Sequence, residues 1–149
     1  MKVFLDTNIL LDLLLERPGY EASARVLELC REKEYTMAGS ILTMVNVAYV
    51  YRKTVGQDLA VVNLKYLSGF IEVLPMDTVM LNQAIGMSGR DFEDTLQAVC
   101  AATGGCDYIV TRNVKDYSIK RGLSKPISLP KVITPGTFAM QHANVELPF

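Results

Sequence analysis

The sequence predicts an α/β fold in which helices flank both faces of one parallel β-sheet. Residues 3–5 (Val-Phe-Leu) and 108–110 (Tyr-Ile-Val) form short unbroken apolar runs, which are typical of strands buried on both faces of such a sheet. Between the two runs, apolar residues recur at helical spacing. Polar residues follow each run directly, at the carboxyl ends where parallel sheets bind their ligands.

The composition indicates one globular domain spanning residues 1–149, with 50% hydrophobic and 21% charged residues. A chain of this length buries about two-thirds of its unfolded surface and needs no metal or disulfide to fold. The net charge of −1 is unevenly distributed: from Thr111 onward there are six basic and two acidic residues. A basic segment near an acidic site suits a polyanion, although such segments are more often ordinary solvated surface.

Cysteine usage and hydropathy indicate a soluble, cytoplasmic protein that does not associate with membranes. Cys30, Cys100 and Cys106 are odd in number and lack a CxxC spacing, so we expect reduced core residues. Asp6 and Asp12 interrupt the apolar N-terminus, which argues against a signal peptide. No segment approaches the roughly 18 consecutive apolar residues of a membrane span.

The first half of the chain alternates predicted strands and helices. The opening strand ends at Asp6, and Asn8 is the expected N-cap of a helix over 9–16, although Asp6 could itself serve only as a helix cap. A helix around 23–30, a strand at 35–38, a helix from an N-cap at Ser40 to about residue 54, and a helix ending at residue 67 follow. Asn46 interrupts an apolar stretch, so its amide should have a partner or face a cleft.

In the second half, a strand at 70–74 precedes a short helix capped by Thr78, and residues 90–103 form the next helix. That helix begins with three acids, of which Asp91 and Glu93 are explained equally well as first-turn acids favoured by the helix dipole. Asp94 lies in line with two alanines, at positions 98 and 101, and small residues let a helix sit close to a sheet. We therefore expect Asp94 near the rim of the sheet.

The last part of the chain contains strands at 107–111 and 131–133, the first of them followed by Arg112, Asn113 and Asp116. Residues 134 and 135 (Thr-Pro) have the pattern of an N-cap and first position of a short final helix. His142 is the single histidine and has no histidine or cysteine cluster around it in the sequence. We expect it to be a surface residue rather than a ligand or base.

Two strand ends and one helix start thus supply Asp6, Asp94, Asn113 and Asp116, which are all hard oxygen ligands. Such ligands select Mg²⁺ or Mn²⁺. A divalent ion held this way lowers the pKa of a bound water and clamps the oxygens of a phosphodiester during in-line attack. The three carboxylates are therefore predicted to be catalytic, in metal-dependent phosphoryl transfer or hydrolysis that needs no histidine.

The chain resembles the PIN domains, small nucleases that include the VapC-type toxins of toxin–antitoxin pairs. The resemblance is carried by the opening residues 3–8, the helix 40–53, Asp94 ahead of residues 108–113, and the closing residues 132–135. It implies a parallel sheet flanked by helices, a carboxylate site for Mg²⁺ or Mn²⁺, and cleavage of RNA. It also implies, as partners, a small antitoxin and frequently a second copy of the chain.

This sequence departs from the common family pattern at two positions. Asn46 stands where the central helix of the family supplies a glutamate, and Asn113 replaces the acid that follows the Thr-Arg pair. The chain resembles a subgroup in which Asp-Phe-Glu-Asp precedes the last core helix and asparagine replaces those acids. Asp6 and Asp94 carry over directly and Asp116 less directly. The candidate supporting residues are Asn8, Asn46, Glu93, whose charge could compensate for the missing acids, and Thr111.

Three hypotheses of function follow. The first is a metal-dependent ribonuclease whose basic residues track the RNA backbone, namely Arg112, Lys115, Lys120 and Arg121. The second is a PIN-fold protein that binds RNA or a partner through a weakened site that no longer cuts. The third is a phosphatase with an aspartyl nucleophile after the first strand, which ranks lowest because the expected second acid is Asn8.

Overall fold

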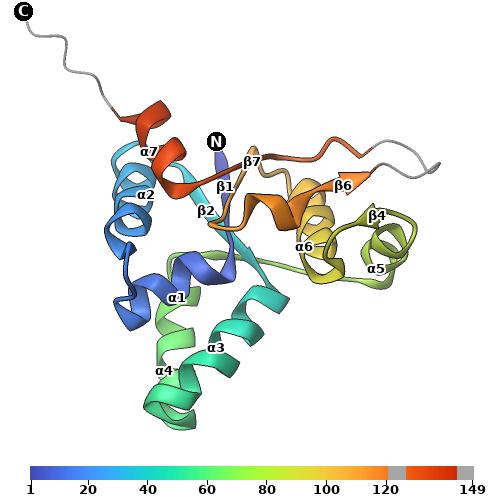
Figure 1. Cartoon of the computed structure of the whole chain (residues 1–149). Helices are drawn as coiled ribbons and strands as arrows, with labels where there is room; N and C mark the ends of the chain where they lie inside the picture. Colours follow the sequence, from blue (N-terminus) through green and yellow to red (C-terminus); the bar gives the residue numbers. More distant parts are fainter. Residues whose placement is uncertain (121–126, 144–149) are drawn as a thin grey trace, which may run out of the picture.

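The computed structural model describes residues 1–120 and 127–143. Five strands form a fully parallel sheet with β1 at its centre (Figure 1). Their order across the sheet is β3 (Glu72–Leu74), β2 (Thr36–Ser40), β1 (Lys2–Leu5), β5 (Tyr108–Val110) and β7 (Lys131–Ile133). The predicted α/β class with one parallel sheet is therefore confirmed.

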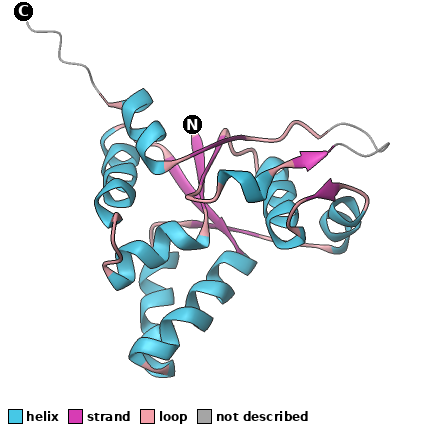
Figure 2. Ribbon diagram, viewed as in Figure 1, coloured by secondary structure: helices cyan, strands magenta, loops and turns pink. Residues whose placement is uncertain are grey.

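Helices make up most of the remaining structure (Figure 2). They are α1 (Thr7–Leu15), α2 (Tyr20–Glu32), α3 (Ile41–Val55), α4 (Gln57–Ser68), α5 (Thr78–Ile85), α6 (Phe92–Thr103), α7 (Pro135–His142) and the 3₁₀ helix η1 (Val114–Tyr117). The sequence did not predict a small antiparallel pair formed by β4 (Ser88–Gly89) and β6 (Ile119–Lys120). No helix in the described residues is long and apolar enough to cross a membrane.

Side chains of the central strand alternate between two hydrophobic cores. Val3 and Leu5 belong to a core shared with α1, α2, α3, α4 and α7, whereas Phe4 belongs to a core shared with α5 and α6. In Figure 1, α2 and α7 accordingly lie on one side of the sheet and α5 and α6 on the other. All three strand residues are fully buried, as expected for a strand covered on both faces.

The helix ends confirm two predicted caps and correct two others. Thr134 caps α7, with Pro135 as the first helical residue, and its hydroxyl accepts a hydrogen bond from the Thr137 backbone N–H. Ser40 caps α3, and its hydroxyl accepts a hydrogen bond from the Thr43 backbone N–H in a capping box. The N-cap of α1 is Asp6 and not Asn8, because the helix starts immediately after the strand and the Asp6 carboxylate already accepts from the first helical N–H. Asp77, not Thr78, caps α5, since its carboxylate reaches the backbone N–H two positions beyond Thr78.

The expectation for the cysteines is confirmed, because Cys30, Cys100 and Cys106 are buried and unpaired. Their burial raises the pKa of each thiol, to about 12 for Cys30 and Cys106 and about 11 for Cys100. Thiols with raised pKa values are poor nucleophiles, so these side chains act as core residues.

The expectation that His142 is a surface residue was wrong. Its ring is half-buried and stacks on Phe138 with 4.2 Å between ring centroids, while Tyr35 and Tyr108 contact its edges. Burial and the neighbouring lysines lower its pKa. The error has a tertiary cause: α7 folds back onto α2 and the sheet, which nothing in the local sequence indicates.

Candidate active site

A pocket of about 270 Å³ lies at the carboxyl ends of the central strand β1 and its neighbour β5. The chain leaves β1 toward β2 on one side and returns through β5 on the other, so this is the topological switch point at which open α/β sheets bind ligands. The pocket brings together six of the predicted residues: Asp6, Asn8, Asn46, Glu93, Asp94 and Asn113. They come from the start of α1, from α3, from α6 and from the loop after β5.

Asp6 lines this pocket and is 6% exposed. Its Oδ1 accepts a hydrogen bond from the Thr7 backbone N–H at 2.8 Å, and its Oδ2 accepts from the Thr111 hydroxyl at 2.7 Å. Burial raises the pKa of Asp6 in spite of these bonds. Asp6 therefore caps α1 and lines the pocket as well, so the two interpretations of this residue are compatible.

Asp94 lies half-buried in the first turn of α6, where its carboxylate has no hydrogen-bond or ion-pair partner in the described part of the chain. Burial, and then repulsion by Asp6 and other nearby carboxylates, raises the pKa of Asp94 to about 7. The expectation that this residue lies near the sheet is confirmed, because Ala98 and Ala101 on the same helix are buried in the core below. A bound cation would relieve the repulsion between the acids.

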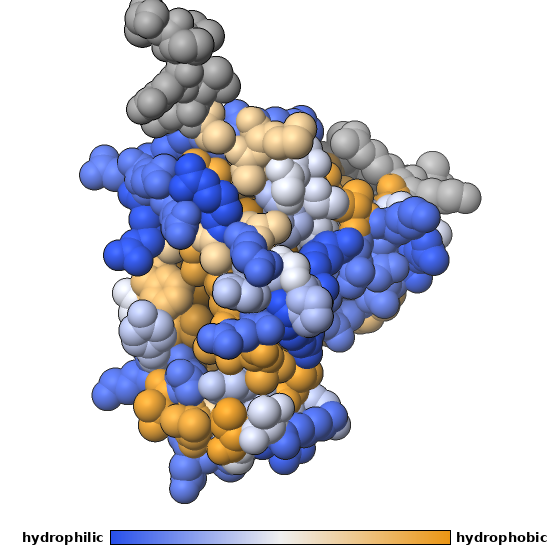
Figure 3. Space-filling model, turned by 60° about the vertical axis from the view of Figure 1, so that its left-hand side comes forward, coloured by the Kyte–Doolittle hydropathy of each residue, from blue (hydrophilic) through white to orange (hydrophobic). Residues whose placement is uncertain are grey.

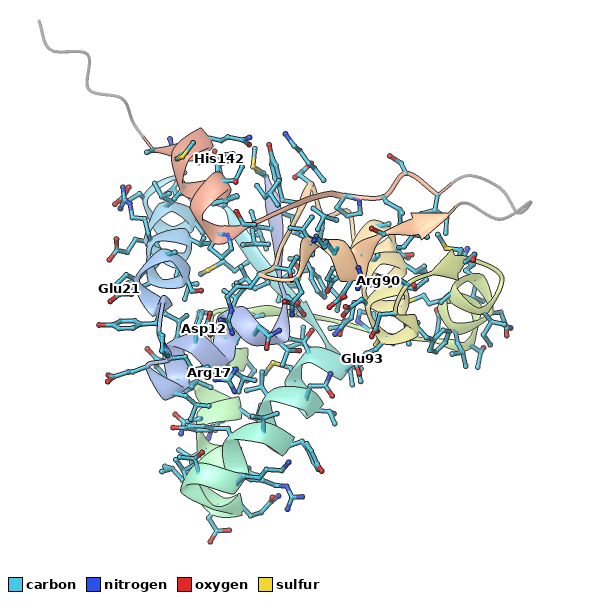
Figure 4. The ribbon with its side chains drawn as sticks, in the orientation of Figure 1. Asp12, Arg17, Glu21, Arg90, Glu93 and His142 are labelled. Carbon is cyan, nitrogen blue, oxygen red and sulfur yellow. The ribbon has the colours of Figure 1, made fainter. Side chains whose placement is uncertain are left out.

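The expectation that Asn46 needs a partner is also confirmed. Its Nδ2 donates to Glu93 Oε1 at 2.6 Å, across the gap between α3 and α6. Figure 4 shows Glu93 where α6 approaches α3. Glu93 thus places a carboxylate beside the Asn46 amide.

Asp116 does not line the pocket. Its Oδ1 lies 3.9 Å from Arg90 Nε, and both side chains are substantially exposed, so this ion pair is weak. The charge of Asp116 nevertheless contributes to the raised pKa values of Asp6 and Asp94. Its predicted role as a ligand stays a prediction.

The predicted RNA-binding cations lie in different surroundings. Arg112 Nη2 pairs at 3.0 Å with Asp12 Oδ1, which is fully buried, whereas Lys115 is exposed on η1. Lys120 ends β6, and Arg121 lies outside the described residues. Arg112 is therefore partly committed to an internal ion pair, although its side chain remains 40% exposed.

Sequence reasoning missed two buried polar networks that hold the pocket in place. Gln97, 1% exposed, accepts from the Ser40 hydroxyl at 2.5 Å and donates to Thr43 Oγ1 at 3.2 Å, which ties α6 to the end of β2. The Asp12 carboxylate accepts from the Ser23 hydroxyl at 3.1 Å and pairs with the loop after β5. A polar residue inside an apolar helical stretch is the sequence signal in both cases.

The pocket residues fit a divalent ion held by few protein ligands. In residues 1–120 and 127–143, no three Asp, Glu, His or Cys side chains are placed to hold one metal ion together. Mg²⁺, however, is usually bound through one or two carboxylates and keeps several waters. The hydroxyl of Thr7 is buried without a described hydrogen-bond partner, which is expected where water or an ion completes a site. The Tyr117 hydroxyl lies beside the Asp6 carboxylate and lowers its pKa. Asp6 and Asp94 are thus the carboxylates best placed for an ion.

The fold and the site together define a small α/β domain with a carboxylate-lined pocket at the switch point of its sheet. The family model described as "PIN domain" matches residues 2–115. The chain belongs to the PIN domain family.

Comparisons with individual proteins agree with this assignment. The chain is 28% identical over 123 residues to Ribonuclease VapC1 from Aquifex aeolicus strain VF5, covering 78% of this chain and 85% of that protein. It shares its fold with a chain in the crystal structure of VapBC2 from Rickettsia felis bound to a promoter DNA fragment (TM-score 0.64, 19% identity, 90% and 98% coverage). A toxin–antitoxin complex from Klebsiella pneumoniae is similar as well (TM-score 0.61, 20% identity, 89% and 97% coverage).

Proposed function

We propose that this protein is a metal-dependent endoribonuclease that hydrolyses RNA phosphodiester bonds. The observation that carries the proposal is the pair formed by Asp94 and Asp6 in the pocket at the carboxyl ends of β1 and β5, two carboxylates that repel each other and form no ion pair with any residue among 1–120 and 127–143. The similarity to Ribonuclease VapC1 supports RNA as the substrate.

In this proposal Asp6 and Asp94 hold Mg²⁺ or Mn²⁺, with Asn113 and Asp116 as the further ligands. Such an ion lowers the pKa of a water and neutralises charge on the phosphodiester oxygens. Thr111 and the Thr7 backbone N–H orient the Asp6 carboxylate through their hydrogen bonds.

The other predicted residues surround this pair. Asn46 orients Glu93, whose charge substitutes for the missing acid, and Asn8 completes the polar wall. Arg112, Lys115, Lys120 and Arg121 are proposed to follow the RNA backbone.

The experiment is cleavage of a fluorescently labelled RNA pool in Mn²⁺ or in EDTA. We expect cleavage by the wild type in Mn²⁺ only, and none by Asp6→Asn or Asp94→Asn, with circular dichroism unchanged. Asp58→Asn, which removes an exposed first-turn acid of α4, is the matched control and should cut normally. Wild-type rates in both site variants would place the active site elsewhere.

A second candidate is a PIN-fold protein that binds RNA or a partner without cutting. It is favoured by the two asparagines, because an amide ligand brings no charge to offset desolvation of the cation. RNA binding by the wild type without any cleavage in Mn²⁺ would support it.

We further propose that the protein is a toxin held by a small antitoxin and forms homodimers. A separate apolar groove of about 960 Å³ lies between α1, α2 and α4, and its walls include Leu10, Leu14, Leu27 and Phe70. Figure 3 shows hydrophobic surface gathered in the lower half of the molecule, at the height of α1, α3 and α4. This groove suits an amphipathic helix of the antitoxin. Leu14→Asp should abolish formation of the complex with the antitoxin. Sedimentation of the protein by itself tests whether it forms a homodimer.

A further inference from the structure

Apart from the aliphatic Leu11 and Val50, two pocket residues have no part in the ion site described above, namely Tyr49 and Arg17. Tyr49 lies on α3, three residues after Asn46; it lines the pocket and is 53% exposed. Arg17 follows the end of α1, where its backbone N–H donates to the Asp12 carbonyl. Figure 4 shows Arg17 at this end of α1, toward α3 and α4.

Two positively charged side chains lie close to the Tyr49 ring. Lys53 Nζ lies 4.3 Å and Arg52 Cζ 5.0 Å from the ring centroid. In the described part of the chain, neither these two cations nor Arg17 has a carboxylate within ion-pair distance. An exposed aromatic ring beside unpaired cations is the combination with which proteins bind single-stranded nucleic acids, through base stacking and phosphate contacts.

We propose that Tyr49 and Arg17 form a nucleotide subsite at the mouth of the pocket. Tyr49 stacks on the base next to the scissile phosphate, and Arg17 binds the phosphate of that nucleotide. Arg52 and Lys53 then contact the adjoining backbone. The proposal rests on the proposed ribonuclease function, and it assigns substrate positioning to α3, on a surface distinct from the basic residues after β5.

A protein interface is the competing use of this helix, because α3 also exposes Ile41 and Val45 at 49% and 56%. Neither of these residues lines the pocket, whereas Tyr49 does. Burying Lys53 and Arg52 in an apolar interface would also require desolvating two charges without partners. The position and the charges therefore favour RNA over a second copy of the chain.

The test measures RNA binding apart from cleavage. Each substitution is placed in the Asp6→Asn background, and affinity for a fluorescein-labelled single-stranded 12-nucleotide RNA is measured by anisotropy at several salt concentrations. We expect Tyr49→Leu to weaken binding by roughly 5- to 150-fold, the range for loss of one stacked base, and Tyr49→Phe to retain it. Arg17→Gln should reduce the salt slope by about 0.7, the value for one phosphate contact on a single strand. Tyr20→Leu, on α2 and 38% exposed, is the control.

The outcomes separate this proposal from the proposed function. If the Asp6→Asn parent binds no RNA, the ribonuclease function fails and this subsite with it. If the parent binds but Tyr49→Leu binds equally well, the subsite alone is refuted. A loss of RNA affinity in Tyr49→Leu accompanied by a lower sedimentation mass would also refute the proposal, because the ring would then belong to an interface between copies. Loss of affinity with unchanged mass and melting temperature supports it.

Discussion

Replacing Asp94 by asparagine should make the protein more stable at neutral pH while it removes activity. The pKa of Asp94 is raised from 3.8 to about 7, so the folded state binds a proton that the unfolded state releases between about pH 4 and 7. The free energy of unfolding therefore falls as pH rises through this window, and the loss is complete above the folded-state pKa. Asparagine does not ionise, so the variant does not lose this stability as the pH rises.

The expected gain in the free energy of unfolding follows from the raised pKa of Asp94. The full difference between the two pKa values corresponds to about 4 kcal/mol, and solvent screening at the partly exposed carboxylate reduces it to about 2–3 kcal/mol. Loss of a first-turn acid from α6 opposes it by about 0.3–1 kcal/mol. The net gain of about 1–3 kcal/mol should raise the melting temperature by about 2–12 °C for a chain of this size.

The assay is thermal unfolding in EDTA at pH 4 and pH 8. Asp94→Asn should melt above the wild type at pH 8 and level with it, or slightly below it, at pH 4. Asp58→Asn removes an exposed first-turn acid from α4 and should show no such difference between the two pH values. A shift for Asp94→Asn that is the same at both pH values would refute the argument that buried, mutually repelling carboxylates destabilise this site.

Three further predictions concern residues at the ends of β5 and η1. Asn113→Asp should tighten Mn²⁺ binding, as measured by calorimetry. A tenfold gain in Mn²⁺ affinity would add about 1.4 kcal/mol to the metal-induced stabilisation, as measured by thermal melting. Equal Mn²⁺ affinity in the variant and the wild type would place Asn113 outside the coordination shell. Arg112→Gln should destabilise the protein by about 3 kcal/mol in urea unfolding, because it leaves the buried Asp12 carboxylate without its cation. Asp12→Asn should destabilise it less, because the asparagine carries no charge and still accepts the hydrogen bond from Ser23. A larger loss of stability in Asp12→Asn than in Arg112→Gln would contradict this reasoning. Lys115→Gln should lower the salt slope of RNA binding by about 0.7, and an unchanged slope would make it ordinary surface.

The local sequence determined the five strands of the parallel sheet, most of the helices, and the positions of Asp6 and Asp94 on their elements. Unbroken apolar runs can only be buried on both faces, and this places residues 3–5 at the centre of the sheet and Asp6 at its ligand-binding edge. The Ser40 cap and the alanines in line with Asp94 are equally local signals. They depend on periodicity and on contacts within one helical turn, which a sequence displays directly.

Only the tertiary structure decided which side chains meet. Asn46 and Glu93 are 47 residues apart, and Thr111 reaches Asp6 across 105. The pairing of Arg112 with Asp12, the ring cluster around His142 and the approach of Arg17 to the pocket likewise depend on how α1, α3 and α7 pack. Residue spacing sets a side chain's face on its own element, but the position of that element depends on burying apolar surface across the whole chain, so these contacts could not be predicted from any one stretch.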